Sequence, residues 1–246
     1  MTWRPTLIVF TREPVPGETK SRLIPRIGAR NAAALAHAFT LDALAKAEAL
    51  RVPIVIAGSA RCDARHAGYF RILAHRFNAR PVDQGEGNLG KRMARALAPL
   101  CNAGALLIGT DTPSLPSRIL AQNVALLRRT RVVLGPSLDG GYYLVGIRGP
   151  LPDIFRGIRW GGAQVLAETL RRLKRMRIPY ALGPSWYDVD RWSDLMLLAA
   201  HLSLHADSAS VRASRRPLPR SASPKPDVHP CPATARLLVR LGLLSL

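Results

Sequence analysis

Short apolar runs alternate along most of the chain with longer segments rich in alanine, leucine and arginine. The apolar runs predict strands at residues 7–10, 53–57, 105–108, 132–134, 142–147 and 186–189. The longer segments predict helices at residues 29–50, 89–100, 116–129, 162–175 and 193–204. Strands that alternate with helices of this length favour right-handed βαβ crossovers. The predicted fold class is therefore α/β, a three-layer αβα sandwich around a mostly parallel sheet.

Two departures from this alternation refine the prediction. Residues 132–134 and 142–147 are separated by GPSLDGG, which is typical of a turn and not of a helix, so the sheet is expected to be mixed. From about residue 205 the composition shifts to serine, proline and arginine, which cannot bury enough apolar surface to fold. We therefore expect a domain at residues 1–204 and a basic, disordered tail at 205–246. The tail ends in ARLLVRLGLLSL, whose leucines and two arginines can form a short amphipathic helix.

Composition excludes several function classes. The net charge is +20, but 31 of the 36 basic residues are arginines spread along the chain, and no aromatic residues interleave with a basic stripe, which argues against nucleic-acid binding. Cys62, Cys101 and Cys231 form no CxxC pair, which argues against a zinc site or a disulfide framework and favours a reducing compartment. The apolar run near the N-terminus is too short for a signal peptide or a membrane span, so we expect a cytoplasmic protein without stable membrane insertion.

The segment ALLIGTDTP places Asp111 just beyond a predicted strand. In open α/β sheets, ligands bind outside the carboxyl ends of the strands, so a carboxylate at this position is well placed to hold a metal ion. The alternative is an Asx turn ahead of the next helix, because aspartate is also a favoured turn residue.

Two loops upstream of Asp111 are candidates for phosphate binding. The first predicted strand runs into TREPVPGETKSRLIP, where Gly17, Lys20 and Arg22 suit a cradle for the phosphates of a nucleotide, unless this is only a solvated basic loop. The second loop, QGEGNLGKRM, carries the pattern GxGxxG at Gly85, Gly87 and Gly90 before a helix. That layout indicates a dinucleotide site with Asp111 as the ribose-binding acid. However, the segment before the glycine pattern is a poor strand, and two βα units precede the pattern. In the simplest alternative, Asn88 is only the N-cap of the helix.

The downstream candidates lie in three segments. In GPSLDGGYYLVGI, Gly140 and Gly141 permit close approach of a ligand, Asp139 can accept hydrogen bonds from hydroxyls and Tyr142 offers an aromatic face, while an ordinary hairpin turn explains the same residues. In WYDVDRWSDL, two carboxylates, Asp188 and Asp190, can complete a metal site with Asp111, unless Asp190 only caps the next helix. Trp160 can form one wall of a pocket or serve as an aromatic packing anchor.

Six motifs follow one another over residues 6–200: VFTREPVPGETKSRLIP, QGEGNLGKRM, LLIGTDTPSL, VVLGPSLDGGYYLVG, IRWGGAQVL and YDVDRWSDL. Taken together, they resemble the GT-A-like transferases described as radical-SAM/selenodomain-associated or arsenosugar-biosynthesis glycosyltransferases. That family is similar to the nucleotide-diphospho-sugar transferase superfamily. It is more distantly similar to the 2-phospholactate guanylyltransferases, which share the KSRL that begins at Lys20.

The resemblance implies a nucleotide-binding αβα sandwich with a divalent ion, Mg²⁺ or Mn²⁺, near Asp111 and a late carboxylate from the DVD segment. It also implies a substrate side at Asp139, Gly140, Gly141 and Tyr142, to which we add Trp160 as a candidate. Phosphate or base contacts are implied for Lys20, Arg22 and the loop that carries Gln84, Gly85, Asn88 and Gly90, and we add Gly17 and Arg92 as nucleotide-binding candidates. The chain departs from the family at Asn88, where aspartate is usual, and at Arg191 and Trp192, where threonine and proline are usual.

These observations predict a metal-dependent transferase that uses a nucleotide-activated donor, with Asp111, Lys20 and Asp139 as catalytic residues. Both sugar transfer and nucleotidyl transfer leave negative charge on a diphosphate, which cations would stabilise. Glycosyl transfer from a nucleotide sugar to a small-molecule acceptor is the favoured reaction. The alternatives are nucleotidyl transfer from a nucleoside triphosphate and a NAD-binding oxidoreductase that uses the glycine pattern.

Overall fold

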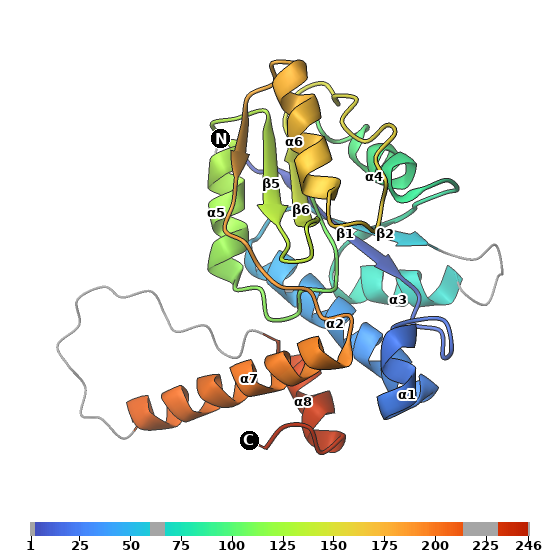
Figure 1. The fold of residues 1–246 in the computed structure, drawn as a ribbon, viewed down its shortest axis with the longest axis vertical. Helices are drawn as coiled ribbons and strands as arrows, with labels where there is room; N and C mark the ends of the chain where they lie inside the picture. The colour runs from blue at the N-terminus through green and yellow to red at the C-terminus, as the bar shows by residue number, and fades with distance from the viewer. Residues whose placement is uncertain (1–2, 60–66, 214–230, 246) are drawn as a thin grey trace.

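The computed structural model describes residues 3–59, 67–213 and 231–245. Its centre is a seven-stranded sheet in the order β3-β2-β1-β4-β6-β5-β7, covered by helices on both faces (Figure 1). The strands are β1 (Thr6–Arg12), β2 (Ile54–Ser59), β3 (Arg80–Asp83), β4 (Ala105–Ile108), β5 (Val132–Pro136), β6 (Tyr142–Ile147) and β7 (Tyr180–Leu182). The helices are η1 (Ser21–Leu23), α1 (Ile24–Ile27), α2 (Ala29–Ala49), α3 (Ala67–Arg76), α4 (Leu89–Leu97), α5 (Ser117–Leu127), α6 (Val165–Arg175), α7 (Trp192–Ala213) and α8 (Pro232–Arg240).

The sheet is mixed, as predicted, and β6 supplies the antiparallel pairings. Strands β3, β2, β1 and β4 pair in parallel, and so do β5 and β7. Strand β6 pairs antiparallel to β4 on one side and to β5 on the other. The segment GPSLDGG forms the end of β5 and the turn into β6, so the hairpin alternative for this segment is confirmed.

The strands are buried on both faces because successive side chains point to opposite sides of the sheet. In β1, Leu7 and Val9 pack with α2, α3 and α5, whereas Ile8 packs on the other face with α4 and α6. All three of these side chains are at most 1% exposed. The predicted three-layer αβα sandwich is therefore confirmed.

A third apolar cluster shows that the predicted disordered tail is wrong for residues 231–245. Helix α8 packs on α2 and α7 and buries Leu237 and Leu238 beside Phe39. The carboxylate of Asp42 on α2 accepts hydrogen bonds from the backbone N–H groups of Ala233 and Thr234, both at 2.9 Å. These N–H groups belong to the first turn of α8, where a helix has no internal acceptors. Helix α7 also extends to Ala213, and residues 214–230 lie outside the described residues.

The other errors in the predicted elements have local causes. Strand β3 was interpreted as a poor strand because its sequence, RPVD, is polar, but it lies at the edge of the sheet, where one side faces solvent. Strand β7, at the opposite edge, has only three residues. The predicted strand at 186–189 is reduced to an isolated bridge between Ser137 and Trp186. No helix in the described ranges is long and apolar enough to cross a membrane. Cys101 and Cys231 are free and buried, and Cys62 lies outside the described residues.

Candidate active site

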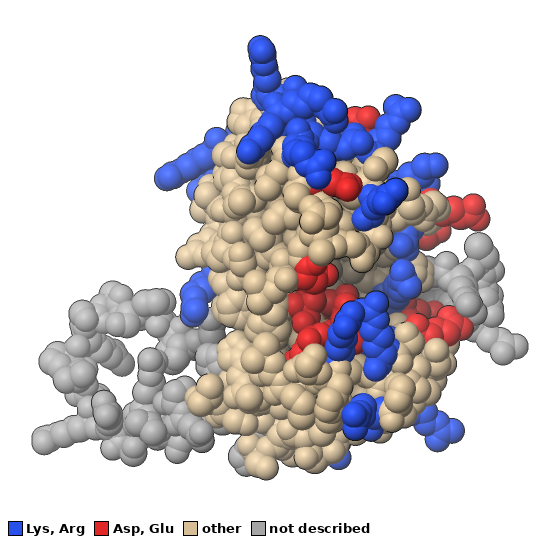
Figure 2. Space-filling model, in the orientation of Figure 1, with Lys and Arg blue, Asp and Glu red and all other residues tan. Residues whose placement is uncertain are grey.

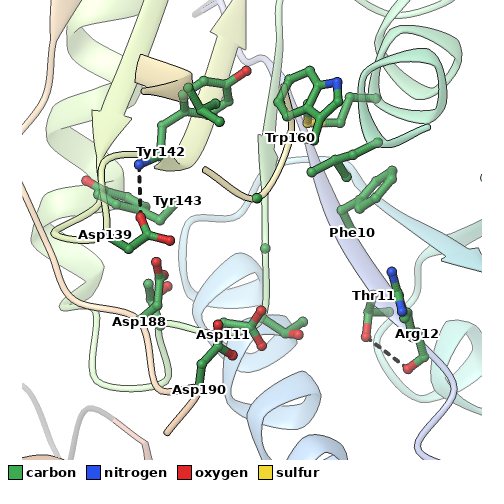
Figure 3. A pocket seen from close by; sticks show the side chains of 18 of the residues that line it. Phe10, Thr11, Arg12, Asp111, Asp139, Tyr142, Tyr143, Trp160, Asp188 and Asp190 are labelled. Atoms are coloured by element: carbon green, nitrogen blue, oxygen red, sulfur yellow. Dashed lines mark hydrogen bonds between the residues drawn. The ribbon is translucent and has the colours of Figure 1, made fainter. Parts of the chain in front are cut away.

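A cleft of about 630 Å³ opens at the carboxyl ends of β1 and β4, which are neighbours in the sheet. Chain connections leave these two strands in opposite directions along the sheet, and ligands bind at such a point in open α/β folds. The cleft has an acidic side and a side with aromatic and basic residues (Figure 3). In the space-filling view, acidic side chains gather in the hollow at the centre of this face, with basic side chains beside them (Figure 2).

Lys20 joins two of the predicted acidic residues. Its Nζ donates to Asp111 Oδ1 at 2.6 Å, to Asp190 Oδ1 at 2.8 Å and to the carbonyl oxygen of Val189 at 2.7 Å. An ammonium has three N–H donors, so all of them are used. Burial lowers the pKa of Lys20, but the carboxylates of Asp111 and Asp190 outweigh burial and hold the pKa above its ordinary value. The predicted phosphate ligand is therefore an ion-paired group within the acidic side of the cleft.

Asp188 and Asp139 complete the acidic side. Burial raises the pKa of Asp188 to about 7, and the negative charges of Asp111, Asp139 and Asp190 act in the same direction. A hydrogen bond from the Ser137 hydroxyl to the Asp188 carboxylate opposes this shift. Figure 3 shows the four carboxylates along one side of the cleft. Asp188 is thus poised to exchange a proton near neutral pH.

Asp139 and Asp194 settle two of the open alternatives. Asp139 is exposed and accepts a hydrogen bond from the backbone N–H of Gly141 at 2.9 Å, so it has the turn-forming role of the hairpin interpretation while it also lines the cleft. At the start of α7, Asp194 Oδ2 accepts from the backbone N–H groups of Asp190 and Arg191, at 3.0 and 2.8 Å. The side-chain hydrogen bonds at the N-terminus of α7 are thus made by Asp194 to the N–H groups just before the helix, and Asp190 Oδ1 accepts from Lys20.

The predicted metal ligands do not form a metal site in this arrangement. Among residues 3–59, 67–213 and 231–245, no three His, Cys, Asp or Glu side chains are placed to hold a metal ion together. The Lys20 ammonium fills the space between Asp111 and Asp190, and Asp188 is bonded to Ser137. A bound Mg²⁺ or Mn²⁺ needs several oxygen ligands directed at one point. The residues present therefore do not fit the ion, and no chemical step below uses it.

On the opposite side of the cleft, Gln84 ties β1, β2 and α4 together. Its Nε2 donates to the carbonyl oxygens of Thr11 and Ala57, both at 2.8 Å, and its Oε1 accepts from Arg92 Nη1 at 2.9 Å. Gln84 is fully buried, so its predicted contact with a nucleotide would need these bonds to break. What it offers the cleft is a fixed position for the Arg92 guanidinium.

The glycine-rich segment packs against protein atoms. Asn88 Oδ1 accepts from the backbone N–H of Lys91 at 3.0 Å, so its N-cap role is confirmed. A Cβ at Gly85 would lie 2.4 Å from the Arg95 side chain, and one at Gly90 would lie 2.7 Å from the Trp160 ring. A side chain at Gly90 would collide with the Trp160 ring and with the carbonyl oxygen of Phe155. The segment also follows edge strand β3 and not β1 or β4, although Gln84 and Arg92 reach the cleft. Both facts argue against a dinucleotide fingerprint.

The remaining predicted residues divide between cleft and scaffold. Arg22, Gly141, Tyr142 and Trp160 line the cleft. The Tyr142 and Trp160 rings meet edge to face with centroids 6.4 Å apart, so Trp160 is both a wall and a packing anchor. Gly140, with φ +89°, supports the loop before α6, because a Cβ there would lie 2.1 Å from the carbonyl oxygen of Ala163.

The prediction also missed residues at the end of β1. Gly17 lies in the exposed turn that follows β1 and is not among the residues that line the cleft, whereas Phe10, Thr11 and Arg12 do line it. The signal was present in the sequence, since Thr11 and Arg12 directly follow the apolar run and continue β1, which was predicted to end at Phe10.

The chain is similar to a described protein family and to solved structures. A family model described as "Uncharacterized protein conserved in bacteria (DUF2064)" matches residues 40–162. A crystal structure from Desulfovibrio desulfuricans G20, described as a candidate nucleotide-diphospho-sugar transferase, superposes with a TM-score of 0.74 and 28% identity. The match covers 85% of this chain and 97% of that chain. The search of curated proteins found no match.

A more distant structure shares the fold alone. The 4-diphosphocytidyl-2C-methyl-D-erythritol synthase from Anaerococcus prevotii DSM 20548 superposes with a TM-score of 0.52 and 11% identity, covering 81% of this chain and 96% of that chain. The expected nucleotide-diphospho-sugar transferase-like fold is therefore confirmed. The narrower likeness to radical-SAM-associated glycosyltransferases stays a prediction.

Proposed function

The chain belongs to the bacterial family described as DUF2064, and we propose that it is a transferase that binds a nucleotide-activated donor in the cleft at β1 and β4. Glycosyl transfer from a nucleotide sugar to a small-molecule acceptor is the favoured reaction. The observation that carries the proposal is the placement of arginines and carboxylates on facing sides of one cleft at the junction of β1 and β4. The 28% identical structure, described as a candidate nucleotide-diphospho-sugar transferase, supports it.

The basic side of the cleft suits the donor's diphosphate. Arg12 and Arg92 belong to this side, and Arg22, two residues after Lys20, also lines the cleft. Burial lowers the pKa of Arg92, and the positive charge of Arg12 acts in the same direction, so these two guanidinium groups lie within electrostatic range. In the described part of the chain, both salt bridges belong to Lys20, which leaves these arginines without a carboxylate partner in a salt bridge. Guanidinium groups bind phosphate oxygens with paired hydrogen bonds and stabilise the charge of a leaving diphosphate.

The acidic side suits the acceptor. In glycosyl transfer, the bond between the anomeric carbon and the diphosphate oxygen breaks, and a bond forms between that carbon and the acceptor hydroxyl oxygen. The hydroxyl proton must leave, and a general base works best when its pKa is near the operating pH. Asp188, whose pKa burial raises to about 7, meets that condition. Asp139, Gly141 and Tyr142 line the same part of the cleft and would orient the acceptor.

Nucleotidyl transfer is the second candidate because the cleft also suits a nucleoside triphosphate. When the acceptor is a phosphate, one of its oxygens attacks the α-phosphorus and pyrophosphate leaves, so no hydroxyl has to lose a proton. Asp188→Asn should therefore lower kcat for glycosyl transfer and leave nucleotidyl transfer to a phosphate nearly unchanged. An activity that is insensitive to this substitution would favour nucleotidyl transfer.

A ligand panel tests the proposal. Gly109 lines the cleft, and a Cβ placed there meets nothing within 4 Å, so a side chain has room to start at this position and the ring of Gly109→Phe should obstruct the cleft. Gly68 on α3 is equally open and lies outside the cleft, so Gly68→Phe is the matched control. In a thermal-shift assay, UDP-glucose or GDP-mannose should stabilise the wild type and the control, but not Gly109→Phe. At 100 times its Kd, a ligand stabilises by about 2.7 kcal/mol.

The panel also includes nucleoside triphosphates and NADH. Stabilisation by a triphosphate but not by a nucleotide sugar favours the second candidate. Stabilisation by NADH alone contradicts the transferase and supports the oxidoreductase.

A further inference from the structure

Lys20 is held in place by its backbone conformation and by the surroundings of its ammonium group. Its backbone has φ 50° and ψ 41°, a left-handed conformation that residues other than glycine rarely adopt. Its carbonyl oxygen accepts the backbone N–H of Leu23 at 2.8 Å at the start of η1. Its Nζ lies 5.1 Å from the centroid of the Phe39 ring, and both Leu23 and Phe39 are fully buried. Strained backbone persists where the surroundings enforce it, and it is frequent at functional sites.

The two carboxylates that Lys20 joins come from segments that are themselves connected. Asp111 follows β4 and Asp190 precedes α7, and the Val189 N–H donates to the Asp111 carbonyl oxygen at 2.8 Å. The Lys20 side chain is 8% exposed, whereas those of Asp111 and Asp190 are 48% and 44% exposed. The ammonium therefore binds from within the protein, and the carboxylates remain open to the cleft, where Figure 3 shows them side by side.

We propose that Lys20 is a positioning residue that serves as the resident cation of this site: its ammonium sets Asp111 and Asp190 in place and excludes a divalent ion from the space between them. An ammonium and a divalent ion both bind carboxylate oxygens, so they are alternatives at a single position. Lys20 then contributes no bond to a phosphate, because each of its three donors has an acceptor at 2.6 to 2.8 Å.

The inference rests on the proposed function only for the role of the site, and its test needs no nucleotide. Mn²⁺ is titrated into the nucleotide-free protein by calorimetry. The wild type should show no saturable binding at Mn²⁺ concentrations up to about 1 mM. Lys20→Met keeps most of the length of the side chain and removes the charged Nζ. This variant should bind one Mn²⁺ at least about tenfold more tightly than the wild type, and Lys20→Met/Asp111→Asn should lose the gain.

Lys91→Met is the matched control because Lys91 is exposed and lies outside the acidic side of the cleft. It should behave as the wild type does. A folded Lys20→Met that binds Mn²⁺ no more tightly than the wild type would overturn the proposal.

Should Lys20→Met fail to fold, the wild type and Asp111→Asn decide the question. Micromolar Mn²⁺ binding to the wild type that Asp111→Asn abolishes would overturn the proposal, and no saturable binding to the wild type would support it. A protein that binds no nucleotide at all leaves this result intact and contradicts only the proposed function.

Discussion

Asp188→Asn should flatten the dependence of stability on pH. Burial, joined by the charges of Asp111, Asp139 and Asp190, raises the pKa of Asp188 from 3.8 to about 7 in the folded protein. Between these two values the folded state holds a proton that the unfolded state has released. The free energy of unfolding therefore falls as the pH rises through this window, because rising pH destabilises the state that binds more protons, which here is the folded state.

The size of this effect follows from the shift in pKa. Each unit corresponds to about 1.4 kcal/mol, so the full effect of Asp188 is about 4 kcal/mol between acidic and alkaline pH. Of this, about 2 to 3 kcal/mol falls between pH 5 and pH 8. Asp188 is incompletely buried, so solvent screening makes these upper values.

Urea denaturation at pH 5 and pH 8 measures this difference. The change in the free energy of unfolding should be smaller in Asp188→Asn than in the wild type by up to about 2 to 3 kcal/mol. Asp153→Asn, at an exposed aspartate outside the cleft, is the control and should follow the wild type. Equal pH dependence in the wild type and Asp188→Asn would refute the electrostatic description of the acidic side.

Two further predictions concern the scaffold, each with urea denaturation as the measurement. Asp42→Ala removes the acceptor of the first N–H groups of α8 and should lower the free energy of unfolding by about 2 to 4 kcal/mol. Glu48→Ala, at an exposed position of α2, which also carries Asp42, should be nearly neutral. Equal losses in the two variants would contradict the capping role. Gly140→Ala forces a Cβ against the Ala163 carbonyl oxygen and should cost more than about 2 kcal/mol. Gly17→Ala, with the same sign of φ in open space, should cost about 1 kcal/mol, and a loss as large as that of Gly140→Ala would contradict the steric argument.

The interior of the fold was predictable because apolar runs bounded by glycine or by turn residues mark buried strands. Strands β4 and β6 have the bounds that the sequence predicted. The edge strands β3 and β7 were not predicted, since one is polar and the other has three residues, and their pairing depends on partners elsewhere in the chain. The amphipathic stretch near the C-terminus indicated a helix there, but not that α8 would pack into the domain. Its first turn is capped by Asp42, which lies 191 residues before Ala233.

The candidate site was predictable in its place but not in its bonding. The position of Asp111 at the end of a buried strand predicts that it lies in the cleft. Asp139, Asp188 and Asp190 were identified in the same way, from the segments GPSLDGGYYLVGI and WYDVDRWSDL. The partners of Lys20 lie 91 and 170 residues along the chain, and no local pattern indicates that its three donors would be used within the protein. Similarly, the glycine-rich segment fits a dinucleotide pattern until the structure shows Arg95 and Trp160 in the space that its glycines leave.

Calorimetric titration of the nucleotide sugar that stabilises the wild type most would test the central claim most directly. Wild-type protein and Gly68→Phe should bind one molecule with equal affinity, and Gly109→Phe, whose added ring fills the cleft at the end of β4, should show no saturable binding. Binding that Gly109→Phe leaves unchanged would place the donor elsewhere on the protein and contradict the assignment of this cleft.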